Sequence, residues 1–300
     1  MKALWAPAFA VALLCVGAAP AADTSASAAA ALRAKYGAMQ DQLSVNQFQR
    51  PLHLESNETP GGVKGDVYAL VNHPFAATGA ALNGPARWCD VLILHLNTKF
   101  CRASNDGSVL QVRIGKKHDQ PLEEAYRVDF AYRVAAETSD YLQIILTANE
   151  GPLSTRDYRI VLEAIPADGK TFIHLTYSYA LGIAGRLAMQ AYLGTTGSGK
   201  VGFTVAGKQA DGSPLHIGGM RGVVERNTMR YYLAIESYLG ALSTPPPAQL
   251  EKRLQDWFAA SERYSRQLHE LERSEYLSMK RKEVSRQQAA ARETTKPAPG

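Results

Sequence analysis

The sequence predicts an α+β fold in which a curved antiparallel β-sheet wraps around one long α-helix. Two observations support this prediction. Alternation of apolar and polar residues, typical of strands, dominates from residue 50 to residue 219. Gly222 to Leu242 then places its large apolar residues in one broad stripe on a helical wheel. No other segment is long enough to cover that stripe, so the helix must lie across the concave face of the sheet.

The strands are expected as a series of short antiparallel segments. In Arg127–Glu137, Val128 and Phe130 face one way while Asp129 and Arg133 face the other, as an antiparallel sheet with one buried face requires. The expected strands are Leu52–Leu54, Val63–Val71, Leu94–Arg102, Val109–Gly115, Arg127–Glu137, Tyr141–Asn149, Asp157–Ile165 and Thr171–Ala180, with a last hairpin formed by Lys200–Ala206 and Leu215–Met220.

Shorter helices are predicted around these strands. Residues 23–31 are rich in Ala, Ser and Thr and are expected to be disordered. A helix then follows over Ala31–Phe48, where Leu32, Tyr36, Met39 and Leu43 have helical spacing, and Pro51 ends it. Further short helices are expected over His73–Leu82, Pro85–Val91 and Gly182–Leu193.

The first 21 residues have the three parts of a secretory signal peptide. Lys2 precedes an apolar run from Ala3 to Gly17, and small residues at Ala19 and Ala21 predict cleavage after Ala21. Lipidation at Cys15 is not expected, because the bulky Leu14 precedes it. The sequence therefore predicts an exported protein, periplasmic or secreted, with an uncleaved N-terminal anchor as the alternative.

Cysteine usage agrees with export. Removal of the leader takes away one of the three cysteines and leaves Cys89 and Cys101. Two cysteines in an exported chain most simply form one disulfide, which would stabilise the fold by roughly 3 kcal/mol. A zinc site usually needs four ligands, so two cysteines do not predict one, and no metal or cofactor is expected.

Four regions are expected along the chain: a signal peptide over 1–21, a flexible or helical segment over 22–49, the main domain over 50–243, and a proline linker with an amphipathic helical tail over 244–300. The net charge of +5 is too small to indicate a nucleic-acid binder. The tail has a heptad-type stripe formed by Leu250, Leu254, Trp257, Tyr264, Leu268 and Leu271. It could pack on its own domain or, over residues 248–288, contact a protein partner or a membrane. The basic residues Lys280–Lys282 are expected at a solvated helix end, with contact to lipid headgroups as the alternative.

One segment resembles a known superfamily. Val63–Leu82, a strand that ends in a His-Pro step and a helix, followed by Trp88, is similar to the opening of START-like (SRPBCC) proteins. This helix-grip group includes polyketide cyclases, Bet v 1-like proteins and lipid-transfer domains. The resemblance covers residues 50–242 and places Gly222–Leu242 as the gripping helix. It implies an apolar cavity between sheet and helix that binds lipids, sterols or polyketides. The helix at Gly182–Leu193, the cysteine pair and the tail depart from the minimal fold.

Candidate ligand-binding residues follow from this placement. The inward stripe of the long helix offers Thr228, Tyr231, Ile235 and Tyr238, and Arg221 lies at its start. His95 and His174 are expected in strands, where a buried imidazole could contact a ligand or act as a base. Each of these residues could equally serve packing alone or lie in solvent.

The function predicted from these observations is an exported binding or carrier protein for an apolar small molecule. No stretch carries a catalytic signature, and Gly197–Lys200 lacks the Ser/Thr and the helix of a phosphate loop. A cyclase or hydratase in the same cavity remains an alternative that needs His95, His174 or Arg221 to point inward. An envelope scaffold that acts through the tail is the third interpretation.

Overall fold

The computed structural model describes residues 21–195, 197 and 199–294, and its centre is one eight-stranded antiparallel sheet. The spatial order of the strands is β1-β2-β8-β7-β6-β5-β4-β3. Their bounds are β1 (Leu52–Thr59), β2 (Gly62–Val71), β3 (Thr98–Ala103), β4 (Val109–Ile114), β5 (Tyr126–Glu137), β6 (Leu142–Glu150), β7 (Thr155–Ala167) and β8 (Lys170–Leu181).

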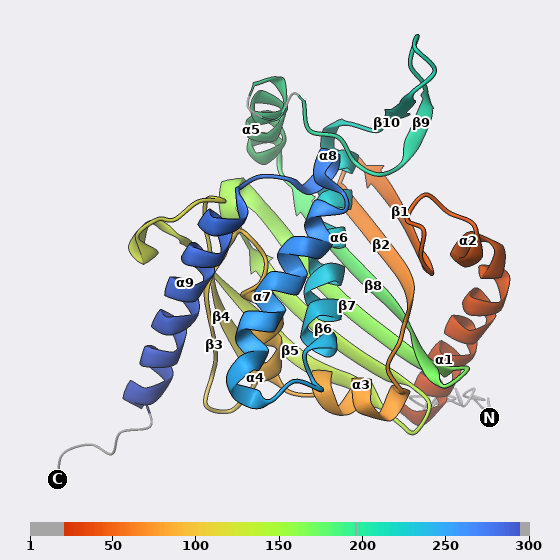
Figure 1. Ribbon diagram of the computed structural model, residues 1–300, viewed down its shortest axis with the longest axis vertical. Helices are drawn as coiled ribbons and strands as arrows, with labels where there is room; N and C mark the ends of the chain where they lie inside the picture. The colour runs from red at the N-terminus through yellow and green to blue at the C-terminus, as the bar shows by residue number, and fades with distance from the viewer. Residues whose placement is uncertain (1–20, 196, 198, 295–300) are drawn as a thin grey trace, which may run out of the picture.

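The long helix α6 (Gly219–Gly240) lies against the inner face of this sheet (Figure 1). Alternate residues of each strand supply the apolar surface that the helix covers, such as Val128 and Phe130 of β5. Gly65 of β2 lets the helix approach closely, because a side chain there would collide with Thr228. The predicted α+β class, with a sheet around a long helix, is therefore the observed one.

Two helices precede the sheet, and two more connect β2 to β3. The first pair is α1 (Ala21–Ala38) and α2 (Gln40–Ser44). The second pair is α3 (Phe75–Leu82) and α4 (Pro85–Leu92). Cys89 of α4 and Cys101 of β3 form the predicted disulfide, with their Cα atoms 5.1 Å apart.

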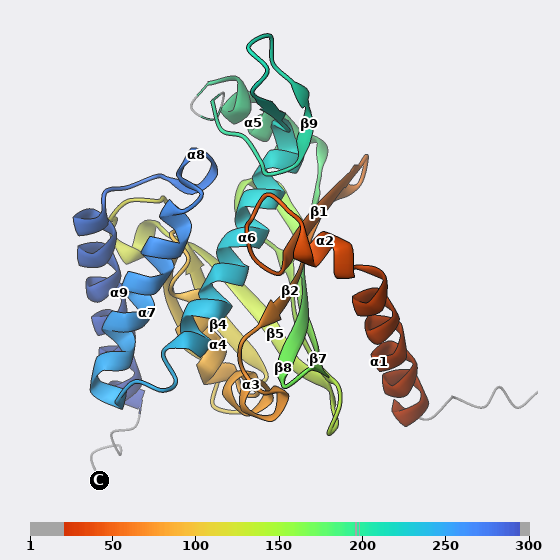
Figure 2. The ribbon, with the colours of Figure 1, turned by 45° about the vertical axis from the view of Figure 1, so that its right-hand side comes forward.

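The outer face of the sheet is covered in part by α1, which lies opposite α6 (Figure 2). The expected disorder over residues 23–31 is wrong, because this stretch is helical in α1. Ala29 and Leu32 are buried in a second apolar cluster with Tyr68 and Phe172 of the sheet. Alanine-rich sequence has high helix propensity, and this packing adds the tertiary support that such a helix needs. Residues 1–20 of the predicted leader lie outside the described residues, so export stays a prediction.

A helix and a hairpin stand at one end of the sheet. They are α5 (Ile183–Gly194) and the two-stranded β9 (Val205–Lys208) and β10 (Pro214–His216). Within the described residues, no helix is both long and apolar enough to cross a membrane.

The tail folds back onto the domain as α7 (Pro246–Glu262), α8 (Ser265–Leu268) and α9 (Arg273–Thr294). Helix α7 packs on the side of α6 that faces away from the sheet, and α9 packs beside β3 (Figure 1). Leu254 and Trp257 are fully buried in the main core. Of the two interpretations of the heptad stripe, the described residues therefore show packing on the same chain.

Candidate functional site

Five aromatic residues gather between the inner face of the sheet and α6. We call this group the aromatic cluster; it consists of Tyr158 of β7, Tyr177 and Tyr179 of β8, Tyr231 of α6, and His95 from the turn after α4. The rings of Tyr177 and Tyr231 have centroids 5.1 Å apart, and His95 stacks on Tyr231 at 4.6 Å. Tyr158 joins them with its ring 6.2 Å from that of Tyr177. Strand and helix side chains therefore meet here, deep in the core.

Most of the polar ends of the aromatic cluster have no partner. Among the described residues, the hydroxyls of Tyr177, Tyr179 and Tyr231 make no hydrogen bond, although these side chains are only 5–8% exposed. Tyr158 differs, because its hydroxyl lies 2.7 Å from Thr155 Oγ1. Each of the three oxygens keeps some accessible surface, so the hydroxyls stay open to water or to a ligand.

His95 adds a fourth unpartnered group. Its Nδ1 accepts a hydrogen bond from the backbone N–H of Asn97 at 3.2 Å, so in the neutral ring Nε2 carries the proton. Nε2 is buried and has no partner among the described residues. Burial, and next the positive charges of Arg230 and Lys280, hold the pKa of His95 well below its usual range. The ring is therefore neutral and offers a donor rather than a base.

The tyrosines of the aromatic cluster also stay neutral. Burial raises the pKa of Tyr177, Tyr179 and Tyr231 above the ordinary value, and the neighbouring Tyr158 adds to the effect. Neutral phenols and a neutral imidazole can donate hydrogen bonds to a carbonyl, ether or hydroxyl oxygen. The site is thus an apolar, aromatic space with four convergent donors, which is the usual composition of a small-molecule site.

Hollows on the molecular surface lie elsewhere. One of about 210 Å³ is lined by Phe48, Phe203 and Tyr264, and another of about 480 Å³ by Glu272, Leu277 and Arg281. Neither lies between the sheet and α6. The rings of the aromatic cluster line the region between the sheet and α6 in which the apolar cavity was expected.

The structure brings together only part of the predicted site. Tyr231 and His95 meet in the aromatic cluster, while Thr228 faces β2 at Gly65 and Ile235 is fully buried. Tyr238 turns toward α7, where the guanidinium of Arg253 lies 4.3 Å from its ring centroid.

Arg221 and His174 lie outside the aromatic cluster. Arg221 donates from Nε to Ser56 Oγ of β1 at 3.0 Å. His174 is on the opposite face of the sheet, stacked on Tyr68 and bonded to Asp66 and Glu163. Side chains of one strand alternate between faces, so His174 cannot share a face with Tyr177. The expected strand at Leu94–Arg102 is also wrong in its first half, because His95 lies in a turn and β3 begins at Thr98.

Sequence reasoning missed three of the five aromatic-cluster residues, Tyr158, Tyr177 and Tyr179. Their strands were predicted, and their positions in the alternation place them on the inner face. The signal available in the sequence was the spacing of these tyrosines. Tyr177 and Tyr179 are two residues apart, so they lie on the same face of β8. Tyr177 is opposite Ile160 of β7, and Tyr158 is two residues from Ile160.

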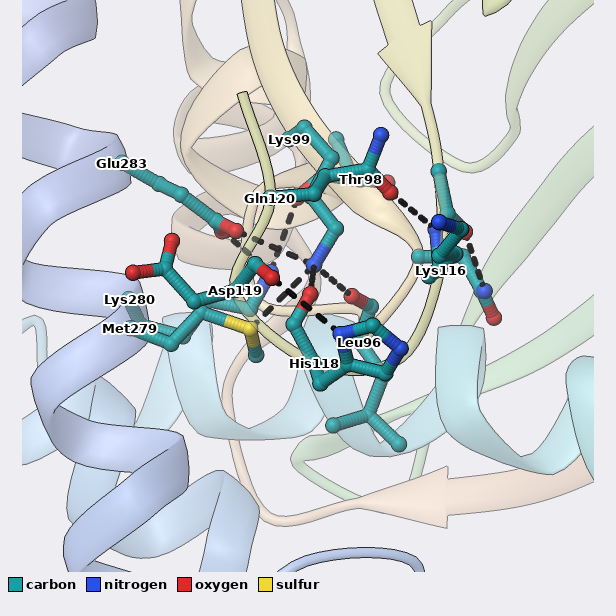
Figure 3. A network of polar contacts seen from close by, with 12 residues as sticks. Leu96, Thr98, Lys99, Lys116, His118, Asp119, Gln120, Met279, Lys280 and Glu283 are labelled. Carbon is teal, nitrogen blue, oxygen red and sulfur yellow. Dashed lines mark hydrogen bonds and ion pairs between the residues drawn. The ribbon is translucent and has the colours of Figure 1, made fainter. Parts of the chain in front are cut away.

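Sequence reasoning also missed a buried charge cluster at the edge of the sheet. Lys99 of β3 and Lys280 and Glu283 of α9 are at most 1% exposed (Figure 3). Glu283 lies 3.1 Å from the Lys99 ammonium and 2.8 Å from that of Lys280. Both expectations for Lys280, a solvated helix end and contact with lipid headgroups, are therefore wrong, because its ammonium donates to the carbonyls of His95 and Thr98 inside the protein.

Comparisons with known proteins show a distant likeness in structure only. No family model matches the sequence, and no curated protein matches it. A conserved protein from Geobacillus kaustophilus is 12% identical, with a TM-score of 0.34, over 59% of this chain and 95% of that one.

Two further solved structures are similar at the same identity of 12%. One is a norcoclaurine synthase point mutant from Thalictrum, with a TM-score of 0.31 over 49% of this chain and 86% of that one. The other is a Polyketide_cyc-like protein from Corynebacterium glutamicum, with a TM-score of 0.29 over 64% and 96%. Scores this low carry no functional information, so the function has to be inferred from the geometry of the site.

Proposed function

We propose that this protein binds an apolar small molecule between the sheet and α6, within the aromatic cluster. One observation carries the proposal: four hydrogen-bond donors, on Tyr177, Tyr179, Tyr231 and His95, lie together in the core and make no hydrogen bond to the described residues, and the donor of His95 is fully buried. An oxygen-bearing apolar ligand would bury its hydrocarbon against the rings and accept from these donors. Burial would contribute about 25 cal/mol per Å² of apolar surface, and the donors would fix the orientation.

Binding is favoured over a cyclase or hydratase reaction by the state of His95. A general base must have a free lone pair, but Nδ1 already accepts from Asn97 and Nε2 carries the proton. His174 and Arg221, the other two candidates, do not reach the aromatic cluster. Export remains part of the proposal, and in that setting the protein would carry or hold its ligand outside the cytoplasm.

The first measurement is a fluorescence titration with N-phenyl-1-naphthylamine, a neutral aromatic probe. We expect saturable binding to the wild-type protein. Displacement of this probe then compares 1-acetonaphthone with 1-ethylnaphthalene, two ligands of nearly the same shape of which only the first has a carbonyl oxygen. We expect the ketone to bind about thirtyfold more tightly, because its carbonyl oxygen can accept two hydrogen bonds and each contributes about 1 kcal/mol.

The matched variants remove hydroxyls without removing rings. Tyr177→Phe and Tyr231→Phe delete groups that make no hydrogen bond with the described residues, so both variants should fold. Each is expected to lower the preference for the ketone by about fivefold. Tyr126→Phe, which alters an exposed tyrosine, is the control. Absence of saturable probe binding, or an unchanged preference in both variants, would refute the proposal.

A further inference from the structure

Three cationic side chains converge on a single carboxylate at the side of α6. Glu270, in the turn between α8 and α9, lies 2.6 Å from the Lys117 ammonium, 2.9 Å from that of Lys200 and 2.9 Å from the Arg230 guanidinium. Arg230 belongs to α6, Lys117 follows β4, and Lys200 precedes β9. Parts of the chain that are far apart in sequence therefore bring positive charge to one point. We call these three cations and Glu270 the basic cluster.

The basic cluster carries more positive charge than its carboxylate neutralises. Burial lowers the pKa of Lys117 to about 8, the charge of Arg230 acts in the same direction, and Glu270 offsets this only in part. Burial would raise the pKa of Glu270, but Arg230 and Lys117 bring it to about 2, so this carboxylate is always ionised. Two ammonium groups and one guanidinium thus share the carboxylate of Glu270, and this concentration of cationic groups attracts anions.

The basic cluster is reachable from solvent. The side chains of Lys117 and Lys200 are each 28% exposed, whereas those of Arg230 and Glu270 are 2% and 7% exposed. A purely structural ion pair needs one cation for each carboxylate. Glu270 is already paired with the buried Arg230, so the partly exposed Lys117 and Lys200 are two more cations than this ion pair requires. Their exposure allows an anion to approach.

The basic cluster adjoins the aromatic cluster through His95. Arg230 and Tyr231 are consecutive residues of α6, and His95 stacks on Tyr231. Arg230 and Lys117 are also close enough to His95 for their charges to lower its pKa. The positive charge of the basic cluster therefore acts on the side of the aromatic cluster that His95 forms.

We infer that the ligand is an amphipathic acid, with an apolar body in the aromatic cluster and one anionic oxygen group, a carboxylate, sulfonate or phosphate, held by Lys117, Lys200 and Arg230. This inference rests on the proposed function, because the aromatic cluster must bind the apolar body. Glu270 occupies part of the basic cluster when the anion is absent, and it competes with the incoming group for the same three cations.

The experiment compares two probes with the same aromatic body. N-phenyl-1-naphthylamine is neutral, and 8-anilinonaphthalene-1-sulfonate adds one sulfonate to the same rings. We expect the wild-type protein to bind the sulfonate more tightly. Lys117→Gln should weaken sulfonate binding about five- to tenfold, because one charge-assisted hydrogen bond is lost, and should change binding of the neutral probe less than twofold. Lys252→Gln, at an exposed pair on α7, is the matched control.

A second variant acts in the opposite direction. Glu270→Gln keeps the shape of the side chain but removes the competing charge, so sulfonate binding should strengthen about fivefold. Circular dichroism of each variant confirms that the fold is retained, and Lys200→Gln replaces Glu270→Gln if the latter does not fold. Lys200→Gln is expected to weaken sulfonate binding as Lys117→Gln does.

The outcomes separate the two proposals. If the neutral probe shows no saturable binding to the wild-type protein, the proposed function fails. If the neutral probe binds and Lys117→Gln leaves the ratio of the two affinities unchanged, only the present inference is overturned. Inorganic phosphate is the third probe. If it displaces the sulfonate at equal concentration, the basic cluster takes free anions rather than the end of an amphipathic ligand, and the inference is again overturned.

Discussion

At the scale of single residues, His174 holds two carboxylates together on the outer face of the sheet. Its Nε2 lies 2.8 Å from Asp66 Oδ1 and its Nδ1 lies 2.9 Å from Glu163 Oε2. Burial opposes a charged ring, but these two hydrogen bonds raise the pKa of His174 overall. Burial likewise opposes charge on Asp66 and Glu163, and bonding to His174 lowers the pKa of both. The role predicted for His174 in ligand binding is thus replaced by a structural one.

This arrangement predicts a pH window of stability. The raised pKa of His174 means that its contribution is full below about pH 6.5 and is lost as the pH rises through the folded pKa. The lowered pKa values of Asp66 and Glu163 mean that theirs is present above about pH 4 and is lost on acidification. Lys64 also pairs with Asp66, with its ammonium 3.0 Å from the carboxylate. The three groups therefore stabilise the fold most between about pH 4.5 and 6.5.

His174→Gln is expected to lower the free energy of unfolding by about 2 kcal/mol at pH 6, because the two carboxylates then lose the cation that lies between them. The difference from the wild type should shrink at pH 9, where the wild-type imidazole has also lost its proton. Urea denaturation at both pH values measures it. His53→Gln, on the edge strand β1, serves as control and should change little. Equal destabilisation at pH 6 and pH 9 would contradict the assigned charge of His174.

The position of a side chain could be predicted where it depends only on the regular repeat of its own helix or strand. The inward position of Tyr231 could be predicted from helical periodicity, because residues three or four positions apart lie on the same face of a helix. Tyr238 did not, since the sequence does not show that α7 rises beside it and offers Arg253. His174 was assigned to a strand but not to a face, and one position of strand register decides between the core and the outer surface.

At the scale of elements, the edge of the sheet is held to α9 by buried charge. Lys99 and Lys280 share Glu283, and their ammonium groups also donate to backbone carbonyls of the turn around His95. Burial lowers the pKa of Lys280 to about 8, with Glu283 acting in the opposite direction. Two buried ammonium groups with one carboxylate are costly to desolvate, so their retention depends on Glu283.

Glu283→Gln is therefore expected to destabilise the protein by about 3 kcal/mol, because it removes the one buried negative charge between two lysines. Thermal unfolding followed by circular dichroism measures the change. Lys282→Gln, one residue away, breaks only the exposed pair with Asp119 and should cost less than about 0.5 kcal/mol. Equal effects from the two variants would mean that the buried cluster contributes no more to stability than the exposed ion pair does.

The polar side of α6 shows why element-level prediction from sequence stopped short. Glu225, Arg226 and Arg230 fall outside the apolar stripe of the helical wheel, where side chains usually meet solvent, yet all three are buried. Glu225 accepts hydrogen bonds from the backbone N–H groups of Phe203 and Thr204. The residues that cover this side come from the loop before β9 and from the tail, and their contacts depend on tertiary placement that periodicity does not encode.

At the scale of the whole molecule, the class of fold could be predicted from the sequence. The packing of the tail that completes the core could not. Antiparallel strands with one buried face and one long amphipathic helix leave few arrangements. The heptad stripe of the tail indicated a helix with a partner, but the partner proved to be the same chain. In the structure the tail completes the burial of α6 and contributes Leu254 and Trp257 to the main core.

Deletion of residues 246–300 is accordingly expected to abolish cooperative unfolding rather than to change only the oligomeric state. The deletion uncovers the side of α6 that α7 covers and removes Glu283 from Lys99, and each effect is worth several kcal/mol against a typical total of 5–15 kcal/mol. Urea denaturation and analytical ultracentrifugation of the truncated chain test this. A truncated protein with unaltered stability would instead support a tail that serves a partner.

The pairing of β2 with β8 has a consequence for how the chain is made. The two strands pair along their whole length, from Gly62 opposite Ala180 to Val71 opposite Thr171, roughly a hundred positions apart in the sequence. While the chain is being synthesised, the β1–β2 hairpin has no neighbour until β8 has emerged, and α6 has no complete surface to rest on. Long-range strand pairing of this kind is slow, because closing the large loop costs conformational entropy before the strand contacts can stabilise it. The core therefore forms late, after most of the chain has emerged from the ribosome.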